Sequence, residues 1–285
     1  MLRPQELVDC IESLPSLPAA TTRLASLIHD PTAGAPQFVE VIKPDIGLTT
    51  SILRLCNSAF FGLSREITSI QQAITLLGSE RIFELAMSSS MAEMLRDVIA
   101  GYQMEARTFW LHSVAVGVLV DRFSDRLPIV KPDLAFISGL LHDVGKLAIG
   151  LYLEDHAGEL LDRVKNHRTS LIGAERELLG TDHAEIGAQL AACWRMPEAI
   201  YWSAMWHHSP TIAPSTANST LIDLVHLADC VACRLGLDFG QDGVVREIDG
   251  NVLRRMSVRE NQLTRIAGES MPEIVDLSRM LIATG

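Results

Sequence analysis

The amino-acid sequence predicts an all-α fold, a bundle of many short helices. Two observations support this prediction. Apolar residues recur three and four positions apart through most of the chain, as on the buried face of a helix, and no segment shows the clear alternation of a β-strand. The composition, with 48% hydrophobic and 21% charged residues among 285, is that of a globular protein with a sizeable core.

Residues 1–100 predict small, closely spaced helices. Leu24 and Leu27 fall on one face of the first helix, and Pro44 stops the second. Asp45 can cap the third helix, and Gly78 breaks the apolar run that follows. We therefore expect helices over residues 19–28, 38–42, 45–57, 70–77 and 79–97.

The second half, from about Met104, predicts longer amphipathic helices. These cover residues 109–119, 133–141, 183–194, 198–208 and 221–235, with further helices inside 252–282. His112 lies on the edge of an apolar stripe, and Asp182 is placed to cap the helix with His183 in its first turn. Gly139 would let a neighbouring helix approach closely. The last helices would either pack back onto the bundle or form a homodimer.

Charge and cysteine content exclude several classes of protein. A formal charge of -11 would repel a phosphate backbone, so we expect no direct binding of nucleic acid. The longest apolar runs are far short of a membrane span, and the N-terminus lacks the pattern of a signal peptide, so we expect a cytoplasmic protein without a membrane contact. Five cysteines argue against a disulfide framework, and Cys230 and Cys233 are interpreted as one turn of helical core.

The stretch from His142 through Asp143 and Gly145 to Lys146 carries the clearest chemistry. Imidazole nitrogen is a borderline donor and carboxylate oxygen a hard one, so the first two residues suit zinc, iron, manganese or nickel better than calcium. The glycine can end the helix that carries them. Two ligands do not make a site, and the candidates for further ligands are His112, His183, His207, His208 and Asp229.

Asp229 is the most informative of these candidates. It lies within a predicted helix and is flanked by Leu227, Ala228 and Val231. An acid enclosed by apolar neighbours either faces a partner or costs several kcal/mol to bury. A partner that neutralises its charge is therefore expected.

A helical bundle can bring such residues together as a metal centre in its core. Because a carboxylate can bridge two cations, Asp143 is the natural link. It would join one metal, held by His112, His142 and Asp229, to a second, held by His183, His207 and His208. Two cations about 3.5 to 4 Å apart would clamp a phosphoryl group, and the implied chemistry is hydrolysis of a phosphoester.

Several strings in the chain resemble the HDOD family, a regulatory relative of the HD-domain phosphohydrolases in bacterial signalling. The resemblance covers roughly residues 10–210, and its most specific strings are residues 14–18, 44–62 and 70–78. It implies an N-terminal HDOD helical subdomain, residues 1–100. An HD-like metal-site subdomain with a C-terminal helical extension would follow, residues 101–285.

The resemblance also bears on the candidate ligands. His112, the His142-Asp143 pair and Asp229 are similar to the four-ligand signature of HD phosphohydrolases. His183 and the His207-His208 pair resemble the extra ligands of the HD-GYP branch, which cleaves cyclic di-GMP. The family match implies that Lys146 contacts phosphate, so Asp143 and Lys146 are the candidate catalytic residues.

Two features depart from the metal-rich relatives. Thr108 stands one turn before His112, where those relatives often place a glutamate. Residues 209–214, behind the histidine pair, contain no Gly-Tyr-Pro. Both departures weaken the case for an enzyme.

Simpler interpretations compete with a metal role. His142 and Asp143 could form a helix-end hydrogen bond, and Lys146 could merely compensate a helix dipole. His183 could be a plain first-turn residue. His207 and its neighbour point about 100° apart on a helix, so both face a core only if the helix ends there.

We expect a regulatory HDOD module that binds a protein partner or a small nucleotide, with a retained HD-type site for divalent metal ions. The site would be dinuclear, with iron, manganese or zinc. The alternative is a metal-dependent phosphodiesterase, with cyclic dinucleotides as one substrate class. A third and weaker hypothesis is a sensor of redox or metal state. The sequence leaves open whether the chain is an enzyme.

Overall fold

The structure is a computed structural model that describes residues 17–28, 30–58, 61, 65–95, 99–167, 169–237 and 246–282. Within these ranges every regular element is a helix, apart from one isolated bridge between Ile99 and Met104. The all-α prediction is confirmed. Parts of the first two HDOD-like strings, residues 14–16, 59–60 and 62, lie outside the described residues.

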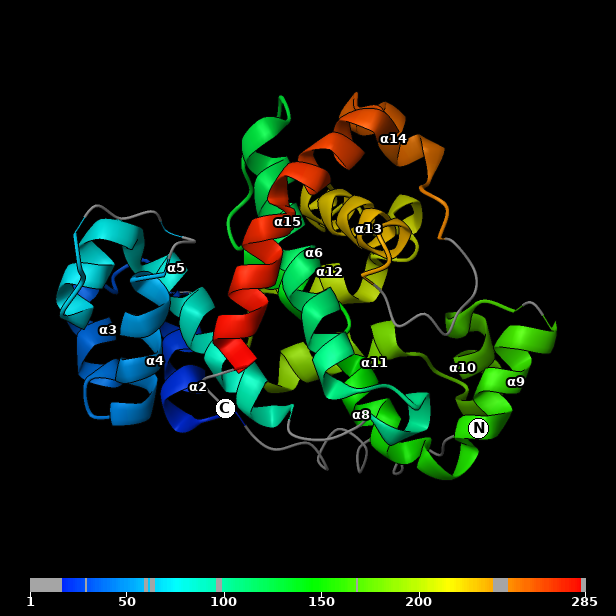
Figure 1. Cartoon of the computed structure of the whole chain (residues 1–285), viewed down its shortest axis with the longest axis horizontal. Coiled ribbons are helices and arrows are strands. Elements are labelled where there is room, and N and C mark those ends of the chain that lie inside the picture. The colour runs from blue at the N-terminus through cyan, green and yellow to red at the C-terminus, as the bar shows by residue number, and fades with distance from the viewer. Residues whose placement is uncertain are drawn as a thin grey trace.

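The N-terminal helices gather at one end of the molecule (Figure 1). They are α2 (Ala19–Ile28), α3 (Ala35–Ile42), α4 (Ile46–Cys56) and the first part of α5 (Ile70–Met94). The carboxylate of Asp45 caps α4 by accepting from the amide of Leu48 at 2.9 Å, as predicted. Gly78 has φ 84° and ψ 159°, so the predicted break there is confirmed as a sharp kink within α5.

The remaining helices make up the larger part of the bundle. They are α6 (Ala106–Arg126), α7 (Ala135–Leu141), α8 (Gly145–Tyr152), α9 (Ala157–His167), α10 (Leu171–Leu179), α11 (His183–Cys193), α12 (Glu198–Trp206), α13 (Ser219–Arg234), α14 (Gly250–Met256) and α15 (Glu260–Ile282). Short 3-10 turns are η1 (Ala100–Tyr102), η2 (Glu154–His156) and η3 (Pro210–Ile212). The sequence did not predict α8, α9 or α10, which follow one another closely.

Helix α6 is the centre of the bundle and packs against α7, α13 and α15. Its contact with α7 is unusually close, because a Cβ on Gly139 would lie 2.8 Å from the Cα of Gly117. The close approach predicted at Gly139 is confirmed. It places His112 of α6 beside the turn that follows α7.

A single apolar cluster runs through both ends of the chain, from Leu17 to Leu277. An ion pair also joins α5 to α6, because Arg81 on α5 contacts Asp121 on α6 at 3.2 Å. The two ends of the molecule therefore share one core. A subdomain boundary at residue 100 stays a prediction.

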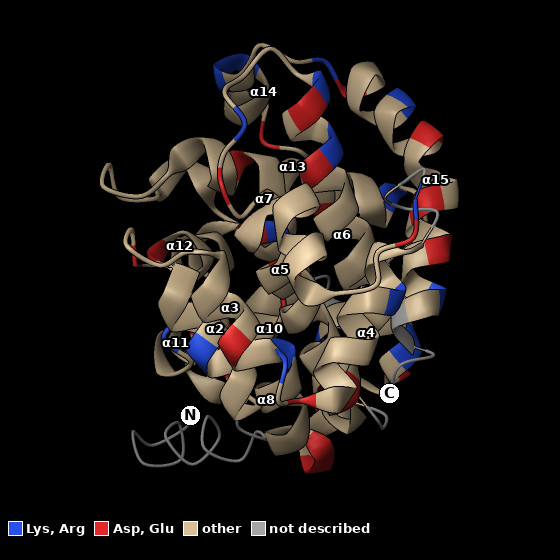
Figure 2. Cartoon of the chain, turned by 90° about the vertical axis from the view of Figure 1, so that its left-hand side faces the viewer, with Lys and Arg blue, Asp and Glu red and all other residues tan. Residues whose placement is uncertain are grey.

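Helix α15 packs back along α6, which is one of the two arrangements expected for the C-terminal helices. Arg122 pairs with Glu273, and Arg126 pairs with Glu269. Figure 2 shows acidic and basic residues following one another along α15. A homodimer stays a prediction.

Among the described helices, none is by itself both long enough and apolar enough to cross a membrane. One helix pair, Ala135–Tyr152 with Glu154–Val164, meets the criteria of length and composition together but is bent by 82°.

Candidate metal centre

A short turn between α7 and α8 carries His142 and Asp143 into the core. Helix α7 ends at Leu141 and α8 begins at Gly145, and both side chains in the turn are fully buried. The prediction that Gly145 ends a helix is wrong, because it is the first residue of α8. Its lack of a side chain serves packing instead, since a Cβ there would overlap the backbone carbonyl of His183.

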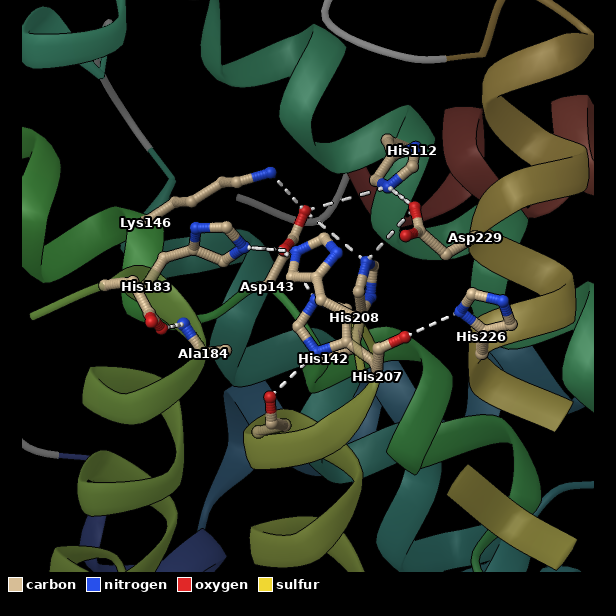
Figure 3. A network of polar contacts seen from close by, with 12 residues as sticks. His112, His142, Asp143, Lys146, His183, Ala184, His207, His208, His226 and Asp229 are labelled. Carbon is tan, nitrogen blue, oxygen red and sulfur yellow. Dashed lines mark hydrogen bonds and ion pairs between the residues drawn. The ribbon is translucent and has the colours of Figure 1, made fainter. Parts of the chain in front are cut away.

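The seven residues predicted as metal ligands lie together, as Figure 3 shows. Separate elements supply them: α6 gives His112, the α7–α8 turn gives His142 and Asp143, the start of α11 gives His183, the end of α12 gives His207 and His208, and α13 gives Asp229. Helix α12 ends at Trp206, so both adjacent histidines can face the centre. Asp182 caps α11 by accepting from the amides of Ala184 and Glu185, which fixes the helix start at His183.

The first ligand group consists of His112, His142, Asp229 and Oδ2 of Asp143. Nε2 of His112 lies 3.3 Å from Oδ1 of Asp229 and 3.7 Å from Oδ2 of Asp143. Nε2 of His142 lies 3.4 Å from the same Oδ2. These atoms face a common space on one side of Asp143.

The second ligand group consists of His183, His207, His208 and Oδ1 of Asp143. Nε2 of His183 lies 3.3 Å from this oxygen, and Nε2 of His207 lies 3.5 Å from it. Nε2 of His183 is also 2.8 Å from Nε2 of His208. Asp143 therefore stands between the two groups and turns one oxygen toward each.

The nitrogen–oxygen separations suit a cation better than hydrogen bonds. N–H···O bonds are usually 2.7–3.2 Å long. Two donors about 2.1 Å from one tetrahedral ion are about 3.4 Å apart. Nε2 of His142, Nε2 of His207 and Oδ1 of Asp143 are buried and make no hydrogen bond with any described residue. One divalent cation at each group would satisfy these three atoms, so the donor set fits metal ions.

Outer hydrogen bonds aim the imidazoles at this space. In three of the histidines, Nδ1 donates to a backbone carbonyl. The pairs are His112 with Leu237 (2.8 Å), His142 with Gly139 (2.7 Å) and His207 with Ala204 (2.7 Å). Since Nδ1 carries the proton, the lone pair is on the inward Nε2. These contacts preset three rings for metal binding.

His183 is oriented by a carboxylate instead of a carbonyl. Its Nδ1 donates to Oε2 of Glu175 at 2.6 Å, and the other oxygen of Glu175 accepts from the hydroxyl of Tyr102 at 2.7 Å. Burial lowers the pKa of His183, but the charge of Glu175 and the hydrogen bonds to Asp143 and Glu175 together outweigh burial and raise the pKa to about 9. A cation at Nε2 would therefore release a proton.

Two positively charged side chains, the buried Lys146 and the partly buried Arg246, neutralise the aspartates. Nζ of Lys146 lies 2.6 Å from Oδ2 of Asp143, and Arg246 pairs with Oδ2 of Asp229. Burial alone would raise the pKa of Asp143, but the His142 imidazole and the Lys146 ammonium hold that pKa well below its usual range. Lys146 is fully buried at the start of α8, so it does not compensate a helix C-terminus on the surface.

Arg246 acts in the same way on Asp229. Burial by itself would raise the pKa of Asp229, but the guanidinium of Arg246 together with the neighbouring imidazoles of His112 and His142 holds that pKa well below its usual range. For His208, burial lowers the pKa well below its usual range, and the neighbouring His207 ring and Arg246 guanidinium lower it further. Asp229 is thus ionised and His208 neutral, as metal ligands must be.

Three other polar residues near the centre are not among the predicted ligands. His226 supports the centre from behind, because its Nδ1 donates to the carbonyl of His207 at 2.8 Å and its Nε2 accepts from the amide of Asp249 at 3.0 Å. Cys230 is core, and burial raises its pKa to about 12. Cys233 lies at the edge of the centre, with Sγ 3.6 Å from Oδ1 of Asp229.

Sequence reasoning missed Glu175, Arg246 and Tyr102. Glu175 lies eight residues before His183, and Arg246 lies 17 residues after Asp229. Tyr102 is distant in the sequence and reaches the centre only through Glu175. Nothing in the local pattern distinguishes the three from ordinary surface charges or a core aromatic. Only the tertiary structure shows that these residues belong to the site.

The described residues form an all-helical bundle with a His-Asp pair in a turn between two helices. Further histidines and an aspartate converge on this pair, and together these features define an HD-type helical protein. The HDOD domain model matches residues 14–210, and the chain belongs to the HDOD family. This match covers more than half of the chain.

Two solved structures share the fold. One is an HDOD domain protein of unknown function from Geobacter sulfurreducens, with a TM-score of 0.77 and 23% identity over 99% of this chain and 96% of that one. The other, from Shewanella amazonensis SB2B, is provisionally named a phosphohydrolase; its TM-score is 0.74, with 23% identity over 96% of this chain and 97% of that one.

An uncharacterized protein of Treponema pallidum (strain Nichols) is 25% identical over 212 residues. That match covers 73% of this chain and 40% of the relative, so this chain spans well under half of that protein.

Proposed function

We propose that this chain is a regulatory HDOD module whose HD half holds two divalent cations and binds a phosphate-bearing small molecule, such as a nucleotide. The observation that carries the proposal is the position of Asp143. Its two carboxylate oxygens face two separate groups of imidazole nitrogens at 3.3–3.7 Å. That arrangement suits a carboxylate that bridges two cations.

The two ligand groups would each hold one cation. When bound, the cations would supply Lewis acidity for phosphoryl oxygens and for water. Imidazole and carboxylate donors suit zinc, iron or manganese. The outer hydrogen bonds to Leu237, Gly139, Ala204 and Glu175 keep the Nε2 lone pairs directed inward and so reduce the reorganisation that binding requires.

The chain's charges support an anionic ligand. Asp143, Asp229 and Glu175 contribute three negative charges near the centre, and Lys146 and Arg246 contribute two positive ones. Two divalent cations would leave the loaded centre strongly positive. A phosphate group is the small-molecule anion that such a centre best accommodates.

Hydrolysis of a phosphodiester is the second candidate function. The same bridging position of Asp143 favours it, and the Shewanella amazonensis relative is provisionally named a phosphohydrolase. Thr108 in place of a carboxylate and the lack of Gly-Tyr-Pro after His208 weigh against it. Binding of a protein partner by the N-terminal helices stays a prediction.

Elemental analysis of protein purified anaerobically without chelator tests the proposal. We expect about two equivalents of iron, manganese or zinc. Asp143→Ala should lose nearly all of it, because both cations share this residue. Asp133→Ala is the matched control, an exposed aspartate ten positions earlier, and should keep the metal.

Calorimetric titration of the loaded protein with mononucleotides and cyclic dinucleotides then tests ligand binding. Chelation or Asp143→Ala should abolish binding. Release of product during long incubation would assign hydrolysis instead of binding alone. A metal content below about a tenth of an equivalent in the wild-type protein would contradict both candidate functions.

A further inference from the structure

The two ligand groups differ in the charges that surround them. Oδ1 of Asp143, which faces the second group, makes no hydrogen bond with any described residue. Oδ2, which faces the first group, accepts from Nζ of Lys146 at 2.6 Å, and both side chains are fully buried. A cation that approaches the first group meets an ammonium already bound to its bridging oxygen.

The second carboxylate of the first group is engaged in the same way. Oδ1 of Asp229 faces the imidazole of His112 at 3.3 Å, while Oδ2 pairs with Arg246. The side chain of Asp229 is 1% exposed, so water screens this pair only weakly. Two positive charges therefore pair directly with the carboxylates of the first group and oppose a metal cation there. At the second group, Arg246 also lowers the pKa of His208, but the carboxylate that it pairs with is Asp229 of the first group.

The second group has a fixed negative charge behind it. Glu175 is fully buried and accepts at 2.6 Å from Nδ1 of His183, opposite the nitrogen that faces the centre. A carboxylate in this position makes the imidazole a stronger donor to a metal. In the second group, the Asp143 oxygen makes no hydrogen bond with a described residue and an anion stands behind His183. In the first group, both carboxylates are already paired with cationic side chains.

We propose that the centre loads in two steps and responds to divalent cation concentration, with a tight position at His183, His207 and His208 and a weak position at His112, His142 and Asp229. This inference rests on the two-cation centre of the proposed function. Filling the weak position requires Nζ of Lys146 to give up its contact with Oδ2 of Asp143. Lys146 is therefore the residue that separates a one-cation form from a two-cation form.

Titration of the metal-free full chain with Mn²⁺ tests this inference, by calorimetry and by the electron paramagnetic resonance of the bound ion. We expect two steps whose dissociation constants differ by about tenfold or more. The first equivalent should give the spectrum of an isolated ion, and the second should give that of a coupled pair.

Two variants assign the steps. Lys146→Met should strengthen the weak step and bring it closer to the tight one, because the competing ammonium is gone. Glu175→Gln should weaken the tight step by about 10- to 100-fold, because the anion behind His183 is gone. Glu177→Gln, an exposed glutamate two positions along α10, is the matched control and should leave both steps unchanged.

Each outcome has a distinct meaning. Two equal steps, a weak step unchanged in Lys146→Met, or an effect of Glu175→Gln on the weak step alone would overturn the two-step inference while the proposed function stands. No bound Mn²⁺ at all would overturn the proposed function itself. Thermal unfolding checks each variant, and if Lys146→Met does not fold, the wild-type titration and Glu175→Gln still decide the question.

Discussion

The backbone carbonyl of His183 lies directly against the Cα of Gly145, where α11 crosses the start of α8. A Cβ on this glycine would overlap that carbonyl and would lie 2.5 Å from the amide of Gly187. Since the obstacles are backbone atoms, no rotamer change could relieve them. The contact fixes His183 relative to the His142-Asp143 turn, so a packing detail sets the geometry of the candidate metal centre.

Gly145→Ala should therefore damage both stability and metal binding. We expect a loss of about 1–3 kcal/mol or more in the free energy of unfolding. The tight Mn²⁺ step should weaken as the start of α11 is displaced. Gly158→Ala on α9 is the control, because a Cβ there meets no atom within 4 Å. Urea denaturation and calorimetry measure both effects, and a Gly145→Ala protein equal to the control would contradict the argument.

Glu84 should make stability depend on pH. Burial raises its pKa to about 8 in the folded protein, although Arg81 opposes the shift, and the ordinary value is 4.5. Between these values the folded chain binds the extra proton, so stability falls as pH rises, by at most about 1.4 kcal/mol per pH unit. Below the lower value both states are protonated and the effect is absent.

Glu84→Gln removes the titrating group, so its free energy of unfolding should exceed that of the wild type more at about pH 8.5 than at about pH 4. Urea denaturation at several pH values measures this difference. Glu105→Gln, at an exposed position before α6, should follow the wild-type profile. Parallel profiles for Glu84→Gln and the wild type would show that burial does not shift this carboxyl.

Arg246→Gln should leave Asp229 as an uncompensated buried charge. The metal-free variant should lose about 3–5 kcal/mol of unfolding free energy, and Mn²⁺ should restore part of it because the cation replaces the missing charge. Arg234→Gln breaks an exposed pair with Glu260 and should cost less than about 1 kcal/mol. Denaturation with and without Mn²⁺ tests this, and equal losses in the two variants would refute it.

Local chemistry made much of the fold predictable. Asp45 and Asp182 indicate helix starts because a short acceptor side chain can accept hydrogen bonds from the first amides of a helix. Gly78 indicates a break because glycine readily adopts a positive φ. The ligands were predictable because imidazoles and an acid within apolar helices are costly to bury unless a partner satisfies them. Their convergence on Asp143 in two groups was also predicted, and the structure places the seven side chains together in that arrangement.

The remaining features depend on contacts that no local pattern encodes. Gly145 was expected at a helix end, yet it begins α8 because a second helix crosses it. In the sequence, Glu175 and Arg246 cannot be distinguished from charged residues on the surface. Only the packing of the helices brings them into contact with His183 and Asp229. Lys146 was expected to contact phosphate or to compensate a helix dipole, and the structure instead places it in the core at the start of α8, paired with Asp143.

The family match ends at residue 210, but the candidate metal centre includes residues beyond that point. Asp229, the carbonyl that orients His112 and the guanidinium of Arg246 all come later in the sequence. A fragment cut at the family boundary would keep six of the seven candidate ligands and lose Asp229. Such a fragment would retain the second ligand group whole and would leave the first group without its own carboxylate.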